Sequence, residues 1–403
     1  MLKTRHQPSS FNTHFDGGAQ LPFAEYLSRT RDMLTKAHAD KPEAEQIKRI
    51  NGNAPFQLWP LGSYSQGLKK PFRRGVLLTH GLTDSPYFMR YLATFFQENG
   101  FRVMAILLPG HGTQPGDLLE VNWQEWAQAV AYGTNQLAAE VDEVYLAGYS
   151  AGCALSINQS LHDQRVRGLF LFSPALKVSP RAARAHWHKF YSWFYPAAKW
   201  VSLKPDKDSY KYESFPKNAA AQMHTLTQVV NAQLQTHQLD IPVFAAASQD
   251  DTTALSAATI SFMAQTPHPV SKLVLYTTNT AAVLQDFPAN KLERINSVFP
   301  AQKILSSAHT AVVLPPDDPH YGIGGIGRLG GMGETAGDYS NCVHYYPADM
   351  EKYNACNERP TEVLQGELTA ENLNVGTLRR LMYNPNFTAL KASLKQFIDS
   401  LPR

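Results

Sequence analysis

Short apolar runs alternate with helical segments along much of the chain, and this alternation restricts its fold more than any other feature. Residues 75–80 and 101–108 are apolar almost throughout, which is typical of strands buried on both faces of a sheet. Residues 87–100 and 122–138 between and after them have helical patterns. Further strands are expected at 56–60, 143–148, 168–173, 242–247, 272–277 and 302–306, and a last helix at 386–401. This order predicts an α/β fold with a mostly parallel central sheet flanked by helices.

One of these strands leads into the pentapeptide Gly148-Tyr149-Ser150-Ala151-Gly152. A G-x-S-x-G pattern between a strand and a helix is typical of a nucleophile elbow. Such a sharp turn would hold Ser150 in a strained conformation with its hydroxyl raised above the sheet. A Cβ at position 148 or 152 would collide with the neighbouring strand or helix. The pentapeptide also arises by chance, so a structural turn serine is the alternative, and the strand–turn–helix context favours a catalytic Ser150.

A catalytic serine needs a base within hydrogen-bond reach, because its hydroxyl is a weak nucleophile at neutral pH. In the elbow fold the partners follow in the chain order serine, acid, histidine. Asp250 and Asp251 follow the strand at 242–247. Asp251 fits the usual spacing better, and Asp250 is the alternative, the other carboxylate then serving as a cap or turn residue.

His309 is the expected base, because it stands on a loop after a later strand and fills the third place of the ordered set. The other candidate is His320, which lies in a proline-bounded turn where a surface role is expected. The sequence therefore predicts Ser150, Asp251 and His309 as the catalytic residues.

Two backbone N–H groups should stabilise the oxyanion of the tetrahedral intermediate. Ala151 follows the nucleophile directly and supplies one. Leu82 is the candidate for the other, because it follows His80-Gly81 at the end of a strand and the glycine lets the backbone approach closely. His80 and Asp84 are expected to shape this loop through hydrogen bonds, without a direct catalytic role.

Two segments interrupt the alternation. Residues 178–238 carry aromatic side chains at helical spacing; we expect a helical cap over the active site, and a helix packed on the core is the alternative. Residues 315–375 are rich in Gly, Pro and Asn and are expected to form a flexible loop. Residues 322–327 within them fit G-x-G-x-x-G, but they do not lie between a strand and a helix, so no dinucleotide site is expected.

The expected organisation follows from these interruptions. A helical extension with a first strand precedes the core, and the extension contains an amphipathic helix, near residues 21–34, that is expected to pack on the outside. The core is formed by two stretches on either side of the cap. The segments are 1–73 for the extension, 74–177 and 239–403 for the core with its insertion at 315–375, and 178–238 for the cap.

Composition excludes some classes of partner. The net charge is +3, from 37 basic and 34 acidic residues, and no clustered basic stripe is present, so a nucleic-acid partner is not expected. No apolar signal segment and no run of about 18 apolar residues is present. A cytoplasmic protein without stable membrane insertion is expected, the cap being the surface for any peripheral contact.

Three cysteines bear on the redox environment. Cys153 is expected to be a small buried apolar residue. Cys342 and Cys356 lie in the loop-rich region and could pair in an oxidising compartment, but the missing signal segment favours free thiols. Their spacing does not resemble a zinc site, and no metal or organic cofactor is expected.

Three motifs together resemble the α/β-hydrolase superfamily: residues 80–86 (His-Gly-Leu-Thr-Asp-Ser-Pro), residues 108–113 (Leu-Pro-Gly-His-Gly-Thr) and residues 148–152. The branch looks like bacterial carboxylesterases and monoacylglycerol lipases. The resemblance extends over about residues 74–310 and the last helix. In such relatives the residue after His-Gly supplies an oxyanion donor, which matches Leu82. The extra segment at 272–298 and the loop at 315–375 depart from the pattern.

We therefore expect a serine hydrolase that cleaves carboxylic esters of small or lipid-like molecules through an acyl-enzyme on Ser150. Aromatic residues of the cap suggest an acyl or aromatic ester. Thioesterase, amidase or peptidase activity uses the same chemistry and stays open. A member of the fold that only binds its ligand is the alternative from another class, and the ordered serine, aspartate and histidine argue against it.

Overall fold

The computed structural model describes residues 2–12, 14–15, 18, 21–62, 70–178, 196–282, 284–323, 341–359 and 362–402. The chain divides into two compact units, the first formed by residues 1–170 and 177–239 and the second by residues 171–176 and 240–403.

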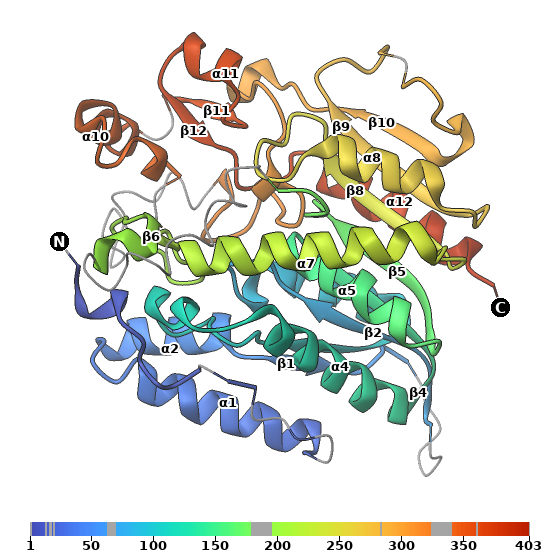
Figure 1. Ribbon diagram of the computed structural model, residues 1–403. Coiled ribbons are helices and arrows are strands. Elements are labelled where there is room, and N and C mark those ends of the chain that lie inside the picture. The colour runs from blue at the N-terminus through green and yellow to red at the C-terminus, as the bar shows by residue number, and fades with distance from the viewer. Residues whose placement is uncertain are drawn as a thin grey trace. The chain divides into compact units, whose positions relative to one another are not determined.

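The first unit contains strands in the order β1-β3-β2-β4-β5 (Figure 1). They are β1 (Phe56–Leu58), β2 (Phe72–Thr79), β3 (Phe101–Ile106), β4 (Val141–Tyr149) and β5 (Val166–Phe172). β2 pairs in parallel with β3 and with β4, whereas β1 is antiparallel to β3. All of β3 and the last five residues of β2 are buried. Burial on both faces explains why these strands are continuous apolar runs in the sequence.

Helices cover this sheet. They are α1 (Phe23–Ala37), α2 (Glu43–Asn53), α3 (Arg90–Glu98), α4 (Trp123–Glu140), α5 (Ala151–His162) and α7 (Lys217–Thr236). α4 and α5 pack on β2 and β4 and against each other (Figure 1). α4 begins where the sequence predicts, because the Asn122 side chain caps it by accepting the Glu125 N–H at 3.1 Å. Leu34 of α1, the expected amphipathic helix, packs with Ile50 and Leu107.

The described part of the expected cap belongs to the first unit. It contains the antiparallel pair β6 (Trp200–Ser202) and β7 (Phe215–Pro216), followed by α7. α7 packs against α5 and α4 (Figure 1), so this helix is one more layer on the first unit. The aromatic stretch at 187–194 lies outside the described residues.

The second unit contains three parallel strands in the order β8-β9-β10 (Figure 1): β8 (Val243–Ser248), β9 (Lys272–Thr277) and β10 (Leu292–Asn296). α8 (Ser256–Gln265) and α12 (Phe387–Ser400) pack on β8 and β9. Parallel pairing with flanking helices in both units confirms the predicted α/β class with a mostly parallel sheet.

The prediction of a strand at residues 302–306 is wrong. Ile304 forms only isolated bridges, to Phe299 and to Gln365, and the strand beside β9 is β10 instead. β10 reads Leu-Glu-Arg-Ile-Asn, and none of its residues is fully buried. A half-buried strand at the end of the order has no continuous apolar run, so its sequence does not indicate a strand.

The insertion has more regular structure than a flexible loop. Its described part contains α10 (Met350–Glu358), β11 (Leu364–Gly366) and α11 (Ala370–Val375), and β11 pairs in parallel with β12 (Leu378–Arg380). The expectation of free thiols is also wrong, because Cys342 and Cys356 form a disulfide. Both cysteines are buried with Tyr345 and Val363 in a small apolar cluster. Most of the G-x-G-x-x-G stretch lies outside the described residues.

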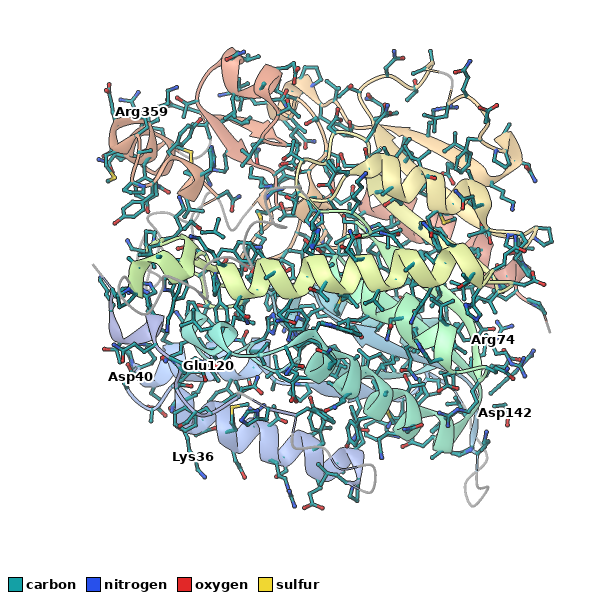
Figure 2. The ribbon with its side chains drawn as sticks, in the orientation of Figure 1. Lys36, Asp40, Arg74, Glu120, Asp142 and Arg359 are labelled. Atoms are coloured by element: carbon teal, nitrogen blue, oxygen red, sulfur yellow. A yellow bond between two sulfur atoms is a disulfide. The ribbon has the colours of Figure 1, made fainter. Side chains whose placement is uncertain are left out.

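Charged side chains mark the outer surface of each unit. Lys36, Asp40 and Asp142 are exposed on the first unit and Arg359 on the second (Figure 2). None of the helices in the described part of the chain combines the length and the apolar content that crossing a bilayer requires.

Candidate active site

Ser150 lies at the turn between β4 and α5 in the first unit. Its backbone has φ 55° and ψ −111°, a conformation that residues with a side chain rarely adopt. A Cβ on Gly148 would lie 2.3 Å from the Gly152 carbonyl carbon, and a Cβ on Gly152 would lie 2.1 Å from the Thr79 carbonyl oxygen. Only glycine fits at either position, so the strand–turn–helix expected from the pentapeptide is present with its strained serine.

The turn also places Ser150 at the start of a helix. Ser150 is the N-cap residue of α5, and Ala151 is the first helical residue. The first N–H groups of a helix have no acceptor within the helix and carry its positive dipole end. The Ala151 N–H is therefore suited to an anionic oxygen. Cys153, one turn on, is fully buried with a free thiol that donates to the Gly148 carbonyl.

The expected oxyanion loop folds closely against this serine. A Cβ on Gly81 would lie 3.1 Å from the Cβ of Ser150, so glycine is needed for the loop to approach. The Asp84 N–H donates to the Gly81 carbonyl at 3.3 Å and closes a turn around Leu82. Thr83 has φ 67°, and its N–H donates to His111 Nε2 at 3.0 Å.

Two buried histidines hold this loop. His80 Nδ1 donates to the Gly81 carbonyl at 2.8 Å, and His80 Nε2 accepts the Leu108 N–H at 3.1 Å. His111 Nδ1 donates to the Pro109 carbonyl at 3.0 Å. Burial lowers the pKa of His111 to about 4. Burial, and after it the charge of His111, lowers the pKa of His80 well below its ordinary value. Both rings are neutral near pH 7, and each links the loop to the segment after β3.

Asp84 is nearly buried in the same loop and forms an ion pair with Lys211 Nζ at 2.9 Å. The next residue, Tyr212, donates its N–H to the Thr83 carbonyl at 2.8 Å. Its hydroxyl accepts the Thr113 N–H at 2.8 Å. Residues 211–212 belong to the segment expected to form a cap, so part of that segment lies directly on the oxyanion loop.

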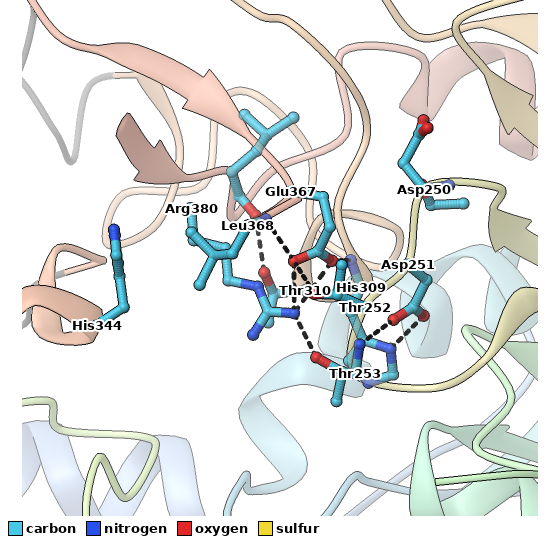
Figure 3. Close-up of polar contacts among 12 residues, drawn as sticks. Asp250, Asp251, Thr252, Thr253, His309, Thr310, His344, Glu367, Leu368 and Arg380 are labelled. Carbon is cyan, nitrogen blue, oxygen red and sulfur yellow. Dashed lines mark hydrogen bonds and ion pairs between the residues drawn. The ribbon is translucent and has the colours of Figure 1, made fainter. Parts of the chain in front are cut away.

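Asp251 and His309 meet in the second unit. Asp251 follows β8 after a short turn, and His309 begins a short 3₁₀ helix. Asp251 Oδ2 lies 2.6 Å from His309 Nδ1, and both side chains are buried (Figure 3). The other carboxylate oxygen accepts the N–H groups of Thr253 and Ala254 at 2.8 and 2.9 Å. An ionised carboxylate can only accept, so His309 Nδ1 donates and Nε2 is the nitrogen able to take up a proton.

The surroundings keep Asp251 ionised. Burial by itself raises the pKa of the Asp251 carboxyl. The charge and hydrogen bond of His309, the Ala254 N–H and the charge of Arg380 outweigh burial and hold this pKa below its usual value.

Asp250 has a different environment, although it is the adjacent residue. Its side chain points away from His309 (Figure 3). Burial, and then the charges of Glu367 and Glu371, raise the pKa of Asp250. Of the two carboxylates that the sequence left open, the structure brings Asp251 to the histidine.

His320 is buried, contrary to the surface role expected for it. It lies in a turn in which Asp318 Oδ1 accepts the N–H groups of His320 and Tyr321 at 2.9 and 2.6 Å. The His320 ring contacts Tyr321 edge to face.

Glu367 and Arg380 contact the acid and histidine loops and were not expected from the sequence. Glu367 is fully buried and accepts the His309 backbone N–H at 2.8 Å (Figure 3). Arg380 forms an ion pair with Glu367 at 2.9 Å. In the sequence the two residues stand in a loop-rich stretch without a recognisable motif, so no local signal points to them. Within the described residues, no group of three or more His, Cys, Asp and Glu side chains could hold a metal ion.

A mostly parallel sheet flanked by helices, with a strained serine between a strand and a helix, defines an α/β-hydrolase. Residues 70–280, more than half of the chain, match the Hydrolase_4 family, described as "Serine aminopeptidase, S33". The chain belongs to this family, and the resemblance to the α/β-hydrolases stated from the sequence motifs is confirmed.

Proteins similar to this chain include one curated relative and two solved structures. Over 109 residues it is 30% identical to the thermostable monoacylglycerol lipase of Bacillus sp. (strain H-257); the match covers 27% of this chain and only 44% of that lipase. A solved chain from work on the metagenome-derived lipolytic enzymes LipS and LipT has 22% sequence identity to this chain and a TM-score of 0.46. The match covers 56% of this chain and 87% of the solved chain. The soluble variant of monoglyceride lipase from Saccharomyces cerevisiae is 15% identical, with a TM-score of 0.41, over 56% of this chain and 82% of that chain.

Proposed function

We propose that this protein is a serine hydrolase that cleaves carboxylic esters, with Ser150 as nucleophile, His309 as general base and Asp251 as the acid that orients it. The observation that carries the proposal is the backbone of Ser150, held at φ 55° at the strand–helix turn. If the turn needed no side chain at this position, a glycine would adopt the same φ without strain. A serine kept there despite the strain is best explained by the chemistry of its hydroxyl.

The proposed reaction proceeds through an acyl-enzyme. Ser150 Oγ attacks the ester carbonyl while His309 Nε2 takes the hydroxyl proton, and the carbonyl oxygen becomes an oxyanion. When the intermediate collapses, the bond to the leaving alcohol breaks and His309 returns the proton to that alcohol. Water then attacks the acyl group with His309 again as base, which releases the acid and restores Ser150.

Backbone donors stabilise the oxyanion in this proposal. The Ala151 N–H stands at the start of α5. The Leu82 N–H belongs to the turn between Gly81 and Asp84, which packs against Ser150. Loss of one such donor costs about 3 kcal/mol of transition-state stabilisation in related chemistry. Because His80 and His111 fix the loop, the donors are held in place before substrate binds.

The proposed substrate class is an uncharged ester with an acyl chain, such as a monoacylglycerol. Two arguments support it. The relative with 30% identity is a monoacylglycerol lipase. The one carboxylate beside Ser150 in the oxyanion loop, Asp84, is already paired with Lys211, so this loop offers no unbalanced charge to a charged substrate.

Labelling with a fluorophosphonate tests the nucleophile. Wild type is expected to lose its esterase activity and to carry the adduct on the peptide that contains Ser150. Ser150→Ala should neither label nor turn over p-nitrophenyl esters. Ser156→Ala is the matched control, because Ser156 is a buried serine of the same helix. An unlabelled wild type, or a labelled Ser150→Ala, would remove the hydrolase proposal and favour a protein that only binds its ligand.

A peptidase is the second candidate, because the description of the matching family is a serine aminopeptidase. A peptidase must hold the α-ammonium group of its substrate. We expect monoacylglycerols and p-nitrophenyl esters to have a higher kcat/KM than aminoacyl p-nitroanilides. A preference for the anilides would replace the esterase by the peptidase and leave the role of Ser150 unchanged.

A further inference from the structure

Glu367 is a fully buried carboxylate that touches two loops of the second unit at once. Its Oε2 accepts the backbone N–H of His309 at 2.8 Å, and its Oε1 accepts the hydroxyl of Thr252 at 3.0 Å (Figure 3). Thr252 is the residue after Asp251. One side chain therefore joins the loop of the candidate acid to the loop of the candidate base.

Arg380 balances the charge of this carboxylate. Its Nη2 lies 2.9 Å from Oε1 and 3.1 Å from Oε2 of Glu367, and it also donates to the Thr253 hydroxyl (Figure 3). A buried carboxylate without a partner is strongly unfavourable, whereas a hydrogen-bonded ion pair is tolerated. Arg380 thus places a cation against Glu367 and holds the acid loop at a second point.

The backbone around Glu367 is fixed to the segment that leads to His309. Gln365 donates its N–H to the Lys303 carbonyl at 2.9 Å and accepts the Leu305 N–H at 2.8 Å. The Glu367 N–H donates to Ser306 Oγ at 3.0 Å. Glu367 therefore directly follows a short strand that is itself bound to the histidine segment, which gives its carboxylate a defined position.

We propose that Glu367, paired with Arg380, is a positioning residue of the candidate active site: it sets the distance and orientation between His309 and Asp251. This inference rests on the proposed function, because Glu367 acts through these two residues and not on the substrate. It also gives the insertion at 315–375 a role in the site. A general base must stay within hydrogen-bond reach of its partners, and small displacements of a catalytic group cost up to about 100-fold in rate.

Glu367→Gln tests the proposal. A glutamine of the same size is uncharged and has an NH₂ group in place of one of the two oxygens to which Arg380 donates, so the ion pair that holds the two loops is lost. We expect kcat on p-nitrophenyl butyrate to fall about 10- to 100-fold, with KM changed less than about twofold, because substrate binding is untouched. Glu371→Gln is the matched control, since Glu371 is an exposed carboxylate of α11, and it should keep the wild-type kcat.

The rate of fluorophosphonate labelling separates the two proposals. If wild type does not label, the proposed hydrolase function fails. If wild type labels and folded Glu367→Gln labels and turns over at the wild-type rate, Ser150 remains the nucleophile and the positioning role is overturned. A fall in kcat and in labelling rate at unchanged KM supports the positioning role.

A second pair of variants keeps the test decisive if Glu367→Gln does not fold. Glu367→Gln combined with Arg380→Met leaves no buried charge unpaired and should fold, as circular dichroism would show, yet remain slow. Arg380→Lys keeps the cation next to Glu367 and should recover most of the kcat that Arg380→Met loses. A folded double variant with wild-type kcat, or equal rates in Arg380→Lys and Arg380→Met, would overturn the proposal.

Discussion

Ser150 pairs a reactive side chain with a backbone conformation that disfavours side chains. Its φ of 55° with ψ of −111° costs about 1–3 kcal/mol for a residue other than glycine. Such a conformation persists only where the surroundings determine it, and here Gly148 and Gly152 allow β4 and α5 to close tightly around the turn. The strained backbone is therefore that of Ser150 alone, and the packing of β4 and α5 on either side stabilises it.

Replacing each of the two adjacent aspartates tests the assignment of the acid. Asp251→Asn should lower kcat by about 10³- to 10⁴-fold, because an amide can donate to His309 Nδ1 and so stabilise the wrong tautomer. Asp250→Asn is the matched control, one residue away and directed away from His309 (Figure 3). It should retain kcat within about threefold. Steady-state turnover of p-nitrophenyl butyrate near neutral pH measures both; a larger loss in Asp250→Asn would exchange the two assignments.

Among the secondary structure elements, those with a continuous apolar run were predictable and the others were not. β3 is buried along its whole length, so a strand buried on both faces could be recognised from composition alone. β10 is half-buried and mixes charged with apolar residues. Residues 302–306 look like a strand locally, but Ile304 bridges to Gln365 of the insertion, a partner that no local pattern identifies.

The candidate site divides in the same way. Ser150 and Asp251 follow strands that the sequence identifies, whereas the segment before His309 only looks like a strand, so the signal for His309 is its place in the order along the chain. Glu367 reaches His309 across 58 residues of sequence, and its position depends on the pairing of β11 with β12. Such short strands have little intrinsic preference, and their pairing is decided by tertiary contacts. This is why the sequence predicted the acid and the base but not the carboxylate between their loops.

The oxyanion loop makes the first unit sensitive to acid. The pKa of His111 is about 4 in the folded protein, against about 6.5 in an unfolded chain. Between these values the unfolded chain binds a proton that the folded protein does not, so the free energy of unfolding falls as the pH drops from about 6.5 to about 4. The loss from this residue is about 3 kcal/mol. His80, whose pKa is also lowered, adds a loss of the same sign.

His111→Gln should flatten this dependence, because glutamine can donate to the Pro109 carbonyl and accept the Thr83 N–H without titrating. Urea unfolding at a series of pH values measures it. His237→Gln is the control, since His237 is exposed and its removal should leave the curve of wild type. If His111→Gln is as acid-sensitive as wild type, the acid sensitivity arises elsewhere in the chain.

At the scale of the whole molecule, composition and covalent structure point to different environments. A net charge of +3 and three cysteines in 403 residues are unremarkable for a protein of a reducing compartment. The disulfide between Cys342 and Cys356 is of a kind that is rare in such compartments, and it weighs against the cytoplasmic location expected from the sequence. The loop that this bond closes contacts β12, the strand of Arg380, because the Leu378 N–H donates to the Tyr345 hydroxyl and Arg379 donates to the Cys356 carbonyl.

Counting the reactive thiols of the unfolded chain shows whether Cys342 and Cys356 are bonded to each other or are free thiols. Without reductant we expect one reactive thiol per chain, from Cys153, and after reduction three. Cys153→Ser should give none without reductant, which identifies the free thiol.

The disulfide should also stabilise the second unit. A bond that closes a loop of this length constrains the unfolded chain by about 3 kcal/mol, so the double variant Cys342→Ser, Cys356→Ser should lower the free energy of unfolding of the second unit by roughly that amount. Three thiols in unreduced protein purified from an oxidising compartment would show that the pair stays reduced, and the stability difference between wild type and the double variant would then vanish.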